Sequence, residues 1–311
     1  MGISANPPLV VLVGATATGK TGLAIAIAQA LNGEIVGADS RQVYRWMDIG
    51  TAKPSAEEQA AAPHHLIDVV DPDQTLSLAT YLEMANAAIR DIQGRGKLPL
   101  LVGGTGQYVT ALIEGWSVPE VAPNPVLRAE MEAYATENGA AALGERLRVL
   151  DPDAYAQIDY RNVRRVIRAL EVIHETGQAF SAQRTKTPPP YRVLHYGLML
   201  DREPLYERAD RRVDAMIRDG FVDEVRGLIE RGYAPSLPSM SGLGYKELAA
   251  HLIDGVPLDA AVSAIYSATH DFIRRQETWF RKYNKDAKWL DSGSIDRAAL
   301  IATLRLRLEE R

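Results

Sequence analysis

The sequence predicts an α/β fold of the P-loop NTPase type, a parallel sheet flanked by helices, with a mainly helical insertion domain. Three observations carry this prediction. Residues 14–21 match the phosphate-loop pattern of Gly, four residues, Gly-Lys and Ser/Thr. The apolar run at residues 9–13 before the loop is typical of a buried parallel strand. After the loop, residues 23–31 have the pattern of a helix that ends at Asn32-Gly33.

Such a loop attracts phosphate for a physical reason. A strand that enters a glycine loop and leaves as a helix points several backbone N–H groups at one spot, and the helix dipole adds positive potential there. Lys20 would bring a charge to the phosphates, and the Thr21 hydroxyl would bind a phosphate-bound magnesium ion. The predicted phosphate-binding residues are Gly14, Ala15, Thr16, Ala17, Thr18, Gly19, Lys20 and Thr21.

Composition excludes several classes of protein. The chain has 311 residues, enough for about two domains, with 46% hydrophobic and 24% charged residues, as in a globular protein. It has no cysteine, so disulfides, thiolate zinc sites and cysteine nucleophiles are excluded. We see neither a signal peptide nor an apolar run of membrane-spanning length, and we expect a cytoplasmic monomer without a membrane partner.

The net charge of −5 does not exclude nucleic acid, because a local basic patch is enough to bind phosphates. Two such patches occur. Arg161, Arg164, Arg165 and Arg168 fall within a short span that holds no acidic residue. Six Arg and Lys residues also cluster in residues 274–288.

Along the chain, residues 34–38 are predicted to form a second strand that ends at Asp39. Ligands of open α/β sheets bind beyond the carboxyl ends of the strands, so the Asp39 carboxylate would face the phosphate loop, unless it only caps a turn. Residues 50–68 lack a period and are interpreted as a loop with short helical pieces, in which His64 and His65 are structural.

A helix is predicted over residues 78–92 and a third strand over residues 98–102. ATPases and GTPases of this fold hold magnesium with an Asp at the end of such a strand. Here Gly103 and Gly104 follow instead, which argues against ordinary nucleotide hydrolysis.

Two proline-rich stretches bracket the predicted insertion, residues 119–190, which divides a core of residues 1–118 and 191–311. Inside it, helices are expected over residues 127–138, 140–149 and 162–176. The core then resumes with a strand at residues 195–200 and a helix at 205–218. On that helix Arg208 and Arg212 share one face, either as ligand contacts or as a salt-bridged exposed face. The last long helix is predicted over Leu258–Tyr283.

Taken together, these residues resemble the tRNA dimethylallyltransferase (tRNA isopentenyltransferase) family. The matching segments appear in family order and cover nearly the whole chain. They are residues 14–21, 39–44, 47–54, 63–68, 101–106, 165–172, 244–246, 275–276 and 278–279. The chain differs from the family pattern at Ala15, where Pro is frequent, and at residues 240–243.

The resemblance implies transfer of a dimethylallyl group from dimethylallyl diphosphate to the exocyclic amine of an adenosine, with Mg2+ as cofactor. That adenosine lies on the 3′ side of the anticodon in tRNAs reading codons that begin with U. The partner is the tRNA anticodon stem-loop, gripped by core and insertion, with the target base flipped into a channel. A diphosphate that leaves also explains a phosphate loop without the usual Asp.

Carried over residue by residue, Asp39 resembles the general base, Arg212 a catalytic contact to the diphosphate and Thr105 a contact near the flipped base. Arg208 is a further candidate for substrate binding. The candidate tRNA contacts are Asp39, Ser40, Arg41, Gln42, Thr105, Arg128, Arg164, Arg165, Val166, Ile167, Arg168, Ser241, Gly242, Leu243, Gly244, Tyr245 and Lys246.

Two other functions share parts of the pattern. A P-loop small-molecule kinase would have the same loop and crevice, and consumption of ATP would identify it. A nucleotide-dependent RNA-binding switch would show RNA affinity controlled by ATP or GTP and would form no product. The ordered set of motifs favours the prenyl transferase over both.

Overall fold

The computed structural model describes residues 6–309 and divides into two compact units, which are treated separately. The first unit runs up to Ile113 and resumes at Pro190, and the second is Glu114–Pro189. The second unit starts at Glu114, five residues before the predicted insertion at residue 119. The reason is that its two connecting segments pair with each other: Ser117 N donates to Thr185 O at 2.9 Å and Thr187 N to Gly115 O at 2.8 Å.

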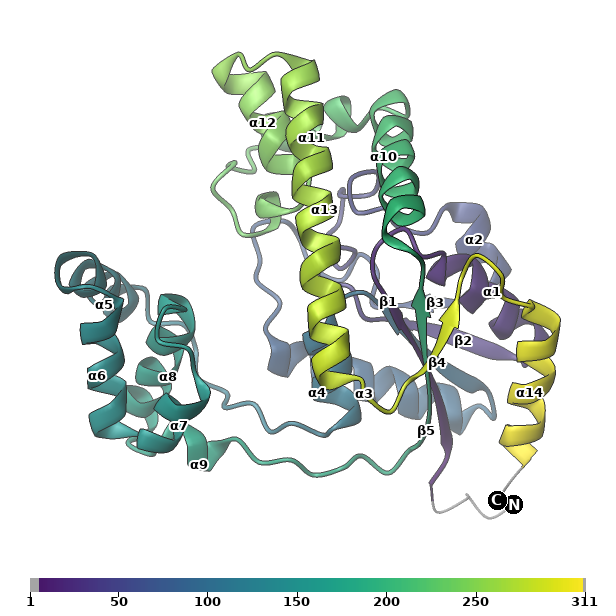
Figure 1. Cartoon of the computed structure of the whole chain (residues 1–311), viewed down its shortest axis with the longest axis horizontal. Coiled ribbons are helices and arrows are strands. Elements are labelled where there is room, and N and C mark those ends of the chain that lie inside the picture. The colour runs from purple at the N-terminus through teal and green to yellow at the C-terminus, as the bar shows by residue number, and fades with distance from the viewer. Residues whose placement is uncertain (1–5, 310–311) are drawn as a thin grey trace. The chain divides into compact units, whose positions relative to one another are not determined.

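The first unit is built on a parallel sheet with the strand order β3-β2-β4-β1-β5-β6. Figure 1 shows this sheet nearly edge-on, with helices on both sides. The strands are β1 (Pro8–Gly14), β2 (Gly33–Gly37), β3 (His64–His65), β4 (Leu98–Gly103), β5 (Arg192–Met199) and β6 (Lys288–Asp291). β1 is central and pairs in parallel with β4 (Val10↔Leu100) and β5 (Val10↔Leu194).

Helices pack on both faces of this sheet because its central strands are apolar on both sides. In the first unit they are α1 (Lys20–Ala30), α2 (Ala56–Ala61), α3 (Leu78–Gly94), α4 (Gly106–Ile113), α10 (Arg202–Arg218), α11 (Phe221–Glu230), α12 (Tyr245–Asp254), α13 (Leu258–Tyr283) and α14 (Arg297–Glu309). The main core joins β1, β4 and β5 to α1 and α14. A separate core lies among α10, α11, α12 and α13 and includes Phe221 and Tyr245.

The second unit is helical and has a core of its own. Its helices are α5 (Pro125–Asn138), α6 (Ala140–Leu150), α7 (Pro152–Gln157), α8 (Val163–Thr176) and α9 (Phe180–Gln183). The buried residues include Leu143, Leu147, Val166 and Leu170, which come from α6 and α8.

The predicted α/β fold is confirmed, and the predicted strands and helices lie within a few residues of the observed ones. The bounds of α13 agree at both ends. Sequence patterns missed the strands β3 and β6 and the helices α4, α11 and α14. β3 is only two residues long and forms on contact with β2, so it has no periodicity of its own. His65 is structural as expected, because its Nε2 lies 2.8 Å from the buried carboxylate of Glu34.

Candidate functional site

The phosphate loop leaves β1 at Gly14 and enters α1 at Lys20, as the motif predicts. Gly14 must lack a side chain, because a Cβ there would lie 2.7 Å from the Leu198 carbonyl oxygen. Ala17 and Gly19 have φ values of 63° and 85°, the left-handed conformation that turns the loop amides inward. The loop is braced from inside, since the buried Thr18 hydroxyl donates to Ala15 O at 2.8 Å.

Lys20 also folds over this loop and donates to Ala15 O at 2.7 Å. Burial of its ammonium group, and secondarily the charge of Arg212, lower the pKa of Lys20 to about 8, although Asp39 acts in the opposite direction. A buried cation with a lowered pKa is stabilised by any anion that reaches it. The loop is therefore electrostatically suited to an anion.

Arg212 of α10 belongs to the same electrostatic group. Burial lowers the pKa of Arg212, while Asp39 raises it. The alternative of a salt-bridged exposed face for Arg208 and Arg212 is wrong, because the neighbouring acids have other partners. Glu207 pairs with Arg211, Asp210 with His270 and Asp214 with the Tyr266 hydroxyl. Arg208 acts on Asp291 of β6. The pKa of Asp291 is lowered mainly by hydrogen bonds from Ser294 and Gly293, and the charge of Arg208 lowers it further.

Asp39 follows β2 and sits in a tight turn. Its Oδ1 accepts from Arg41 N at 2.8 Å and from Gln42 N at 3.4 Å, so it does cap a turn, as one interpretation proposed. Its charge nevertheless acts on both Lys20 and Arg212. The two interpretations are compatible, because one carboxylate oxygen holds the turn while the carboxylate as a whole remains beside the cations.

Thr105, at the start of α4, is fastened to the same turn. Its N–H donates to Ala38 O at 3.1 Å, and its Oγ1 accepts from Ser40 N at 3.0 Å. Tyr108, whose N–H donates to Thr105 O at 3.0 Å, stacks its ring on that of Tyr81, with the ring centroids 3.8 Å apart. Burial, then the charges of Tyr44 and Asp39, raise the pKa of Tyr108 to about 12, so this phenol stays neutral at neutral pH.

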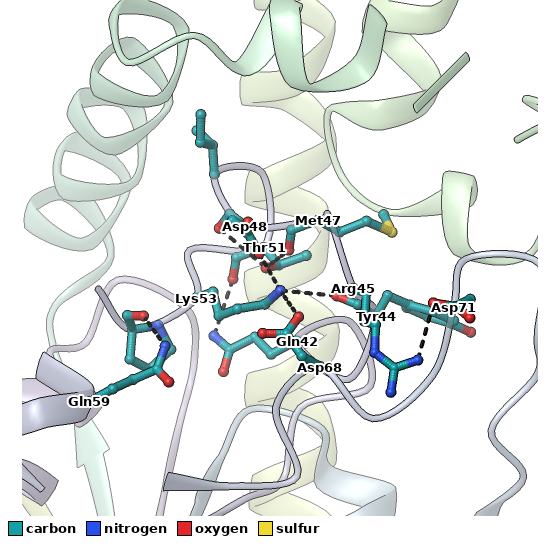
Figure 2. A network of polar contacts seen from close by, with 12 residues as sticks. Gln42, Tyr44, Arg45, Met47, Asp48, Thr51, Lys53, Gln59, Asp68 and Asp71 are labelled. Atoms are coloured by element: carbon teal, nitrogen blue, oxygen red, sulfur yellow. Dashed lines mark hydrogen bonds and ion pairs between the residues drawn. The ribbon is translucent and has the colours of Figure 1, made fainter. Parts of the chain in front are cut away.

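The segment after Asp39 is stabilised by an internal polar network (Figure 2). Lys53 is almost fully buried and donates to Tyr44 O at 3.0 Å, to Asp68 at 2.6 Å and also to Asp48. Gln42 donates to Thr51 O and Ala52 O at 3.2 and 3.1 Å. This network fixes a long segment without regular structure, and so it fixes the turn that carries Asp39.

Glu224 of α11 supports the same segment from the other side. Its carboxylate accepts from the consecutive amides of Asp48, Ile49 and Gly50 at 2.8, 2.7 and 3.1 Å, and from the Tyr245 hydroxyl at 2.6 Å. No sequence motif pointed to Glu224. The one available signal was its place in a helix otherwise apolar on its buried face.

Several predicted tRNA contacts have partners within the protein. Arg168 donates to the buried Glu171 at 2.6 Å and to Val121 O at 3.0 Å, and Arg128 binds the same carboxylate at 2.7 Å. The expectation that Arg168 lacks a compensating acid is therefore wrong, because Glu171 lies one helical turn further on. Val166 and Ile167 are corrected too: their side chains are 0% and 3% exposed in the core of the second unit.

Arg164 and Arg165 differ from these residues. Both are exposed on α8, and within residues 6–309 neither side chain has an ion pair. Arg161 of the same group pairs with Asp159 at 2.7 Å. The predicted basic patch is thus reduced to Arg164 and Arg165.

The predicted tRNA contacts from Ser241 to Lys246 include both buried and exposed residues. Tyr245 is 1% exposed and packs edge-on against Phe221 at 4.9 Å, so the side chain of this predicted contact belongs to the core. Gly242, Leu243 and Gly244 are buried or partly buried, while Ser241 and Lys246 are exposed. Arg41 is fastened to this stretch, donating to Pro238 O at 2.8 Å and to Ser241 Oγ at 3.2 Å.

In the phosphate loop one backbone amide already has a partner: the Thr16 amide donates to Gln276 Oε1 at 2.9 Å. That bond commits Thr16 N to the protein, so the amides from Ala17 onward are the ones available to a phosphate. Gln276 of α13 belongs to one of the segments that resemble the family, residues 275–276, but the sequence alone did not indicate this contact.

Comparison with known proteins agrees with this geometry. The family model described as IPP transferase matches residues 42–283, and the one described as Isopentenyl transferase matches residues 7–68. The chain is 57% identical over 275 residues to the tRNA dimethylallyltransferase of Roseiflexus castenholzii, covering 88% of this chain and 90% of that protein. It is 53% identical over 299 residues to the enzyme of the same name from Herpetosiphon aurantiacus, covering 96% and 95%.

Solved structures are similar as well. The tRNA isopentenylpyrophosphate transferase from Bacillus halodurans is 39% identical, with a TM-score of 0.73 and 98% of each chain covered. A eukaryotic dimethylallyltransferase acting on tRNA is 28% identical, with a TM-score of 0.78, over 92% of this chain and 74% of that one. With the phosphate loop, Asp39 and the two cations gathered at one edge of the sheet, this chain belongs to the IPP transferase family, among the tRNA dimethylallyltransferases.

Proposed function

We propose that the protein transfers the dimethylallyl group of dimethylallyl diphosphate to the exocyclic amine of the adenosine 3′ to the anticodon. The substrates are tRNAs that read codons beginning with U, and the second product is diphosphate. The observation that carries the proposal is that the charge of Asp39, in the turn after β2, acts on both Lys20 of the phosphate loop and Arg212 of α10. Two cations beside an anion-binding loop suit a leaving diphosphate, and a carboxylate beside them suits an amine that must lose a proton.

The reaction requires both halves of this site. The adenine amine is a poor nucleophile, because its lone pair is delocalised into the ring. As its nitrogen forms a bond to C1 of the dimethylallyl group, the C1–O bond breaks and the electron pair leaves with the diphosphate. The nitrogen becomes positive and transfers a proton to the Asp39 carboxylate. Lys20, Arg212 and the loop amides stabilise the charge that develops on the leaving oxygen.

Magnesium fits this donor set as a partner of the diphosphate. Within residues 6–309, no cluster of His, Cys, Asp and Glu could hold a metal by itself. Mg2+ commonly binds through substrate phosphates and one or two protein oxygens, and Thr21, beside Lys20 in the first turn of α1, offers a hydroxyl for that purpose. When bound, the ion would neutralise charge on the leaving diphosphate.

RNA binding is supported by exposed positive charge. We assign the phosphate contacts to Arg164 and Arg165, with Ser241 and Lys246 as exposed groups of the first unit. Arg41 and Gln42 act by shaping the turn at Asp39, through their bonds to Pro238 O and to Thr51 O.

Within residues 6–309, none of the helices is long and apolar enough to cross a membrane.

The test is to incubate the protein with unmodified tRNA, magnesium and labelled dimethylallyl diphosphate, and to locate the label by nuclease digestion and mass spectrometry. We expect one labelled adenosine, next to the anticodon. A matched tRNA with guanosine at that position should take no label. Label elsewhere, or consumption of ATP with no label transferred, would reject the proposal in favour of another RNA site or a kinase.

A further inference from the structure

Gln276 is a buried amide that joins two turns of the first unit. It lies on α13 and is 7% exposed. Its Oε1 accepts from Thr16 N at 2.9 Å, and its Nε2 donates to Gly104 O at 2.9 Å. The orientation of this amide is fixed, because an N–H group faces one end of it and a carbonyl faces the other. Only a side chain with a donor and an acceptor of this reach satisfies both turns.

The two turns have different tasks in prenyl transfer. Thr16 belongs to the phosphate loop, which would hold the leaving diphosphate. Gly104 precedes Thr105, whose Oγ1 accepts from Ser40 N at 3.0 Å, directly beside Asp39. Gln276 is therefore the link in a continuous series of contacts from the loop at the electrophile to the turn that carries the base.

Among the glycines at and after the end of β4, Gly104 makes room for this link, while Gly103 and Gly106 allow other close contacts. A Cβ on Gly104 would lie 2.5 Å from Gln276 Nε2, and a Cβ on Gly106 would lie 2.2 Å from the Trp279 ring. A Cβ on Gly103 would meet the Ala38 carbonyl oxygen at 2.0 Å. No aspartate fits where hydrolases of this fold carry one. The neutral amide of Gln276 contacts that turn instead.

We propose that Gln276 is a positioning residue that holds the phosphate loop and the Thr105 turn at a fixed spacing. The inference rests on the proposed prenyl transfer. The attacking nitrogen and C1 must approach within about 3–3.5 Å, and small errors in that distance slow a reaction more than they weaken binding. Loss of the link should therefore reduce kcat, while affinity for tRNA and for dimethylallyl diphosphate changes little.

The test compares Gln276→Met, which keeps the volume and removes both bonds, with Gln276→Glu, which keeps the shape. An ionised Glu cannot donate to Gly104 O. We expect kcat to fall about 10–100-fold in both variants, with dissociation constants within about threefold of wild type. Thr269→Val is the matched control: Thr269 is 6% exposed on the same helix, and within the described chain its side chain bonds to neither turn. It should retain wild-type kcat.

A double-mutant cycle separates positioning from general loosening. If Gln276 acts through the Thr105 turn, Gln276→Met and Thr105→Ala should be non-additive, with the double variant close to the slower single variant. Additive losses, a kcat within threefold of wild type, or a loss confined to KM would overturn the inference. Wild-type protein that labels no tRNA would instead overturn the proposed function.

Discussion

Among single side chains, Asp39 has the most demanding role in the proposed reaction, and the turn around it allows a clean test. Asp39→Asn keeps the Oδ1 that accepts from Arg41 N and Gln42 N, so the turn should remain. The variant loses the base. We expect turnover to fall by about 10²–10⁴, the usual contribution of a general base, with tRNA and diphosphate affinities nearly unchanged. Single-turnover kinetics and binding measurements check this.

The alternative role for Asp39 is an indirect one, through the metal that Thr21 would hold. A loss that is restored by raising magnesium would assign Asp39 to that role. Turnover within tenfold of wild type would end the base hypothesis.

Lys20 should make diphosphate binding depend on pH. In the free protein, burial and Arg212 lower the pKa of Lys20 to about 8, from an ordinary 10.5. Below that pH the ammonium is charged and attracts the diphosphate. As the pH rises through about 8 the charge is lost, so affinity should fall by up to about tenfold per pH unit.

The measurement is calorimetric titration of dimethylallyl diphosphate between about pH 7 and 9.5, with Lys20→Met as the control for titration of the ligand itself. At neutral pH the variant should bind more weakly by about 1.5–3 kcal/mol, the worth of a charged hydrogen bond. A slope of the same size in Lys20→Met would show that Lys20 is not the titrating group.

At the scale of the element, α8 carries both an arginine paired with a buried carboxylate and exposed arginines that we propose bind RNA. Arg165→Ala should weaken tRNA binding and lower the salt dependence by about one unit, since one phosphate contact is lost. Its unfolding should match that of wild type. Binding titrations at several salt concentrations check both points.

Arg168→Ala should do the reverse. Among the described residues it leaves the buried Glu171 with Arg128 as its one charged partner, so the second unit should lose about 1–3 kcal/mol of stability. Denaturant unfolding of both variants gives the comparison. If Arg168→Ala changed the salt slope and left stability intact, its contact with Glu171 would be incidental.

At the scale of the whole molecule, each unit has its own hydrophobic core, so the two should fold separately. The connecting segments pair at Trp116 and Lys186, which allows residues 118–184 to be replaced by an Asn-Gly turn. We expect the remaining unit to fold and to bind dimethylallyl diphosphate within a few-fold of wild type. It should lose most of its tRNA affinity, because Arg164 and Arg165 are removed.

Circular dichroism, calorimetry and tRNA binding test this variant against the full chain. An aggregated or unfolded product would show that the first unit needs the second. Undiminished tRNA binding would move the RNA contacts to the first unit.

Sequence patterns sufficed where structure depends on neighbours in the chain. The loop from Gly14 to Thr21 is set by glycine conformation and helix dipole, and α13 by its apolar spacing, so both could be predicted. Asp39 was placed correctly at the carboxyl edge, although β4 lies between β1 and β2. That placement held because the strand ends of a parallel sheet meet at one edge, whatever their order.

Tertiary structure alone decided which polar groups are paired. Glu171 removes Arg168 from the basic patch, and Tyr245 points into the core although its motif suggested RNA. Gln276 meets Thr16 across 260 residues, and Glu224 meets the amides near Ile49 across 175. Hydrogen bonds and ion pairs are short-ranged, so their partners are fixed only when packing brings distant segments together. Local patterns in the sequence therefore do not predict these partners.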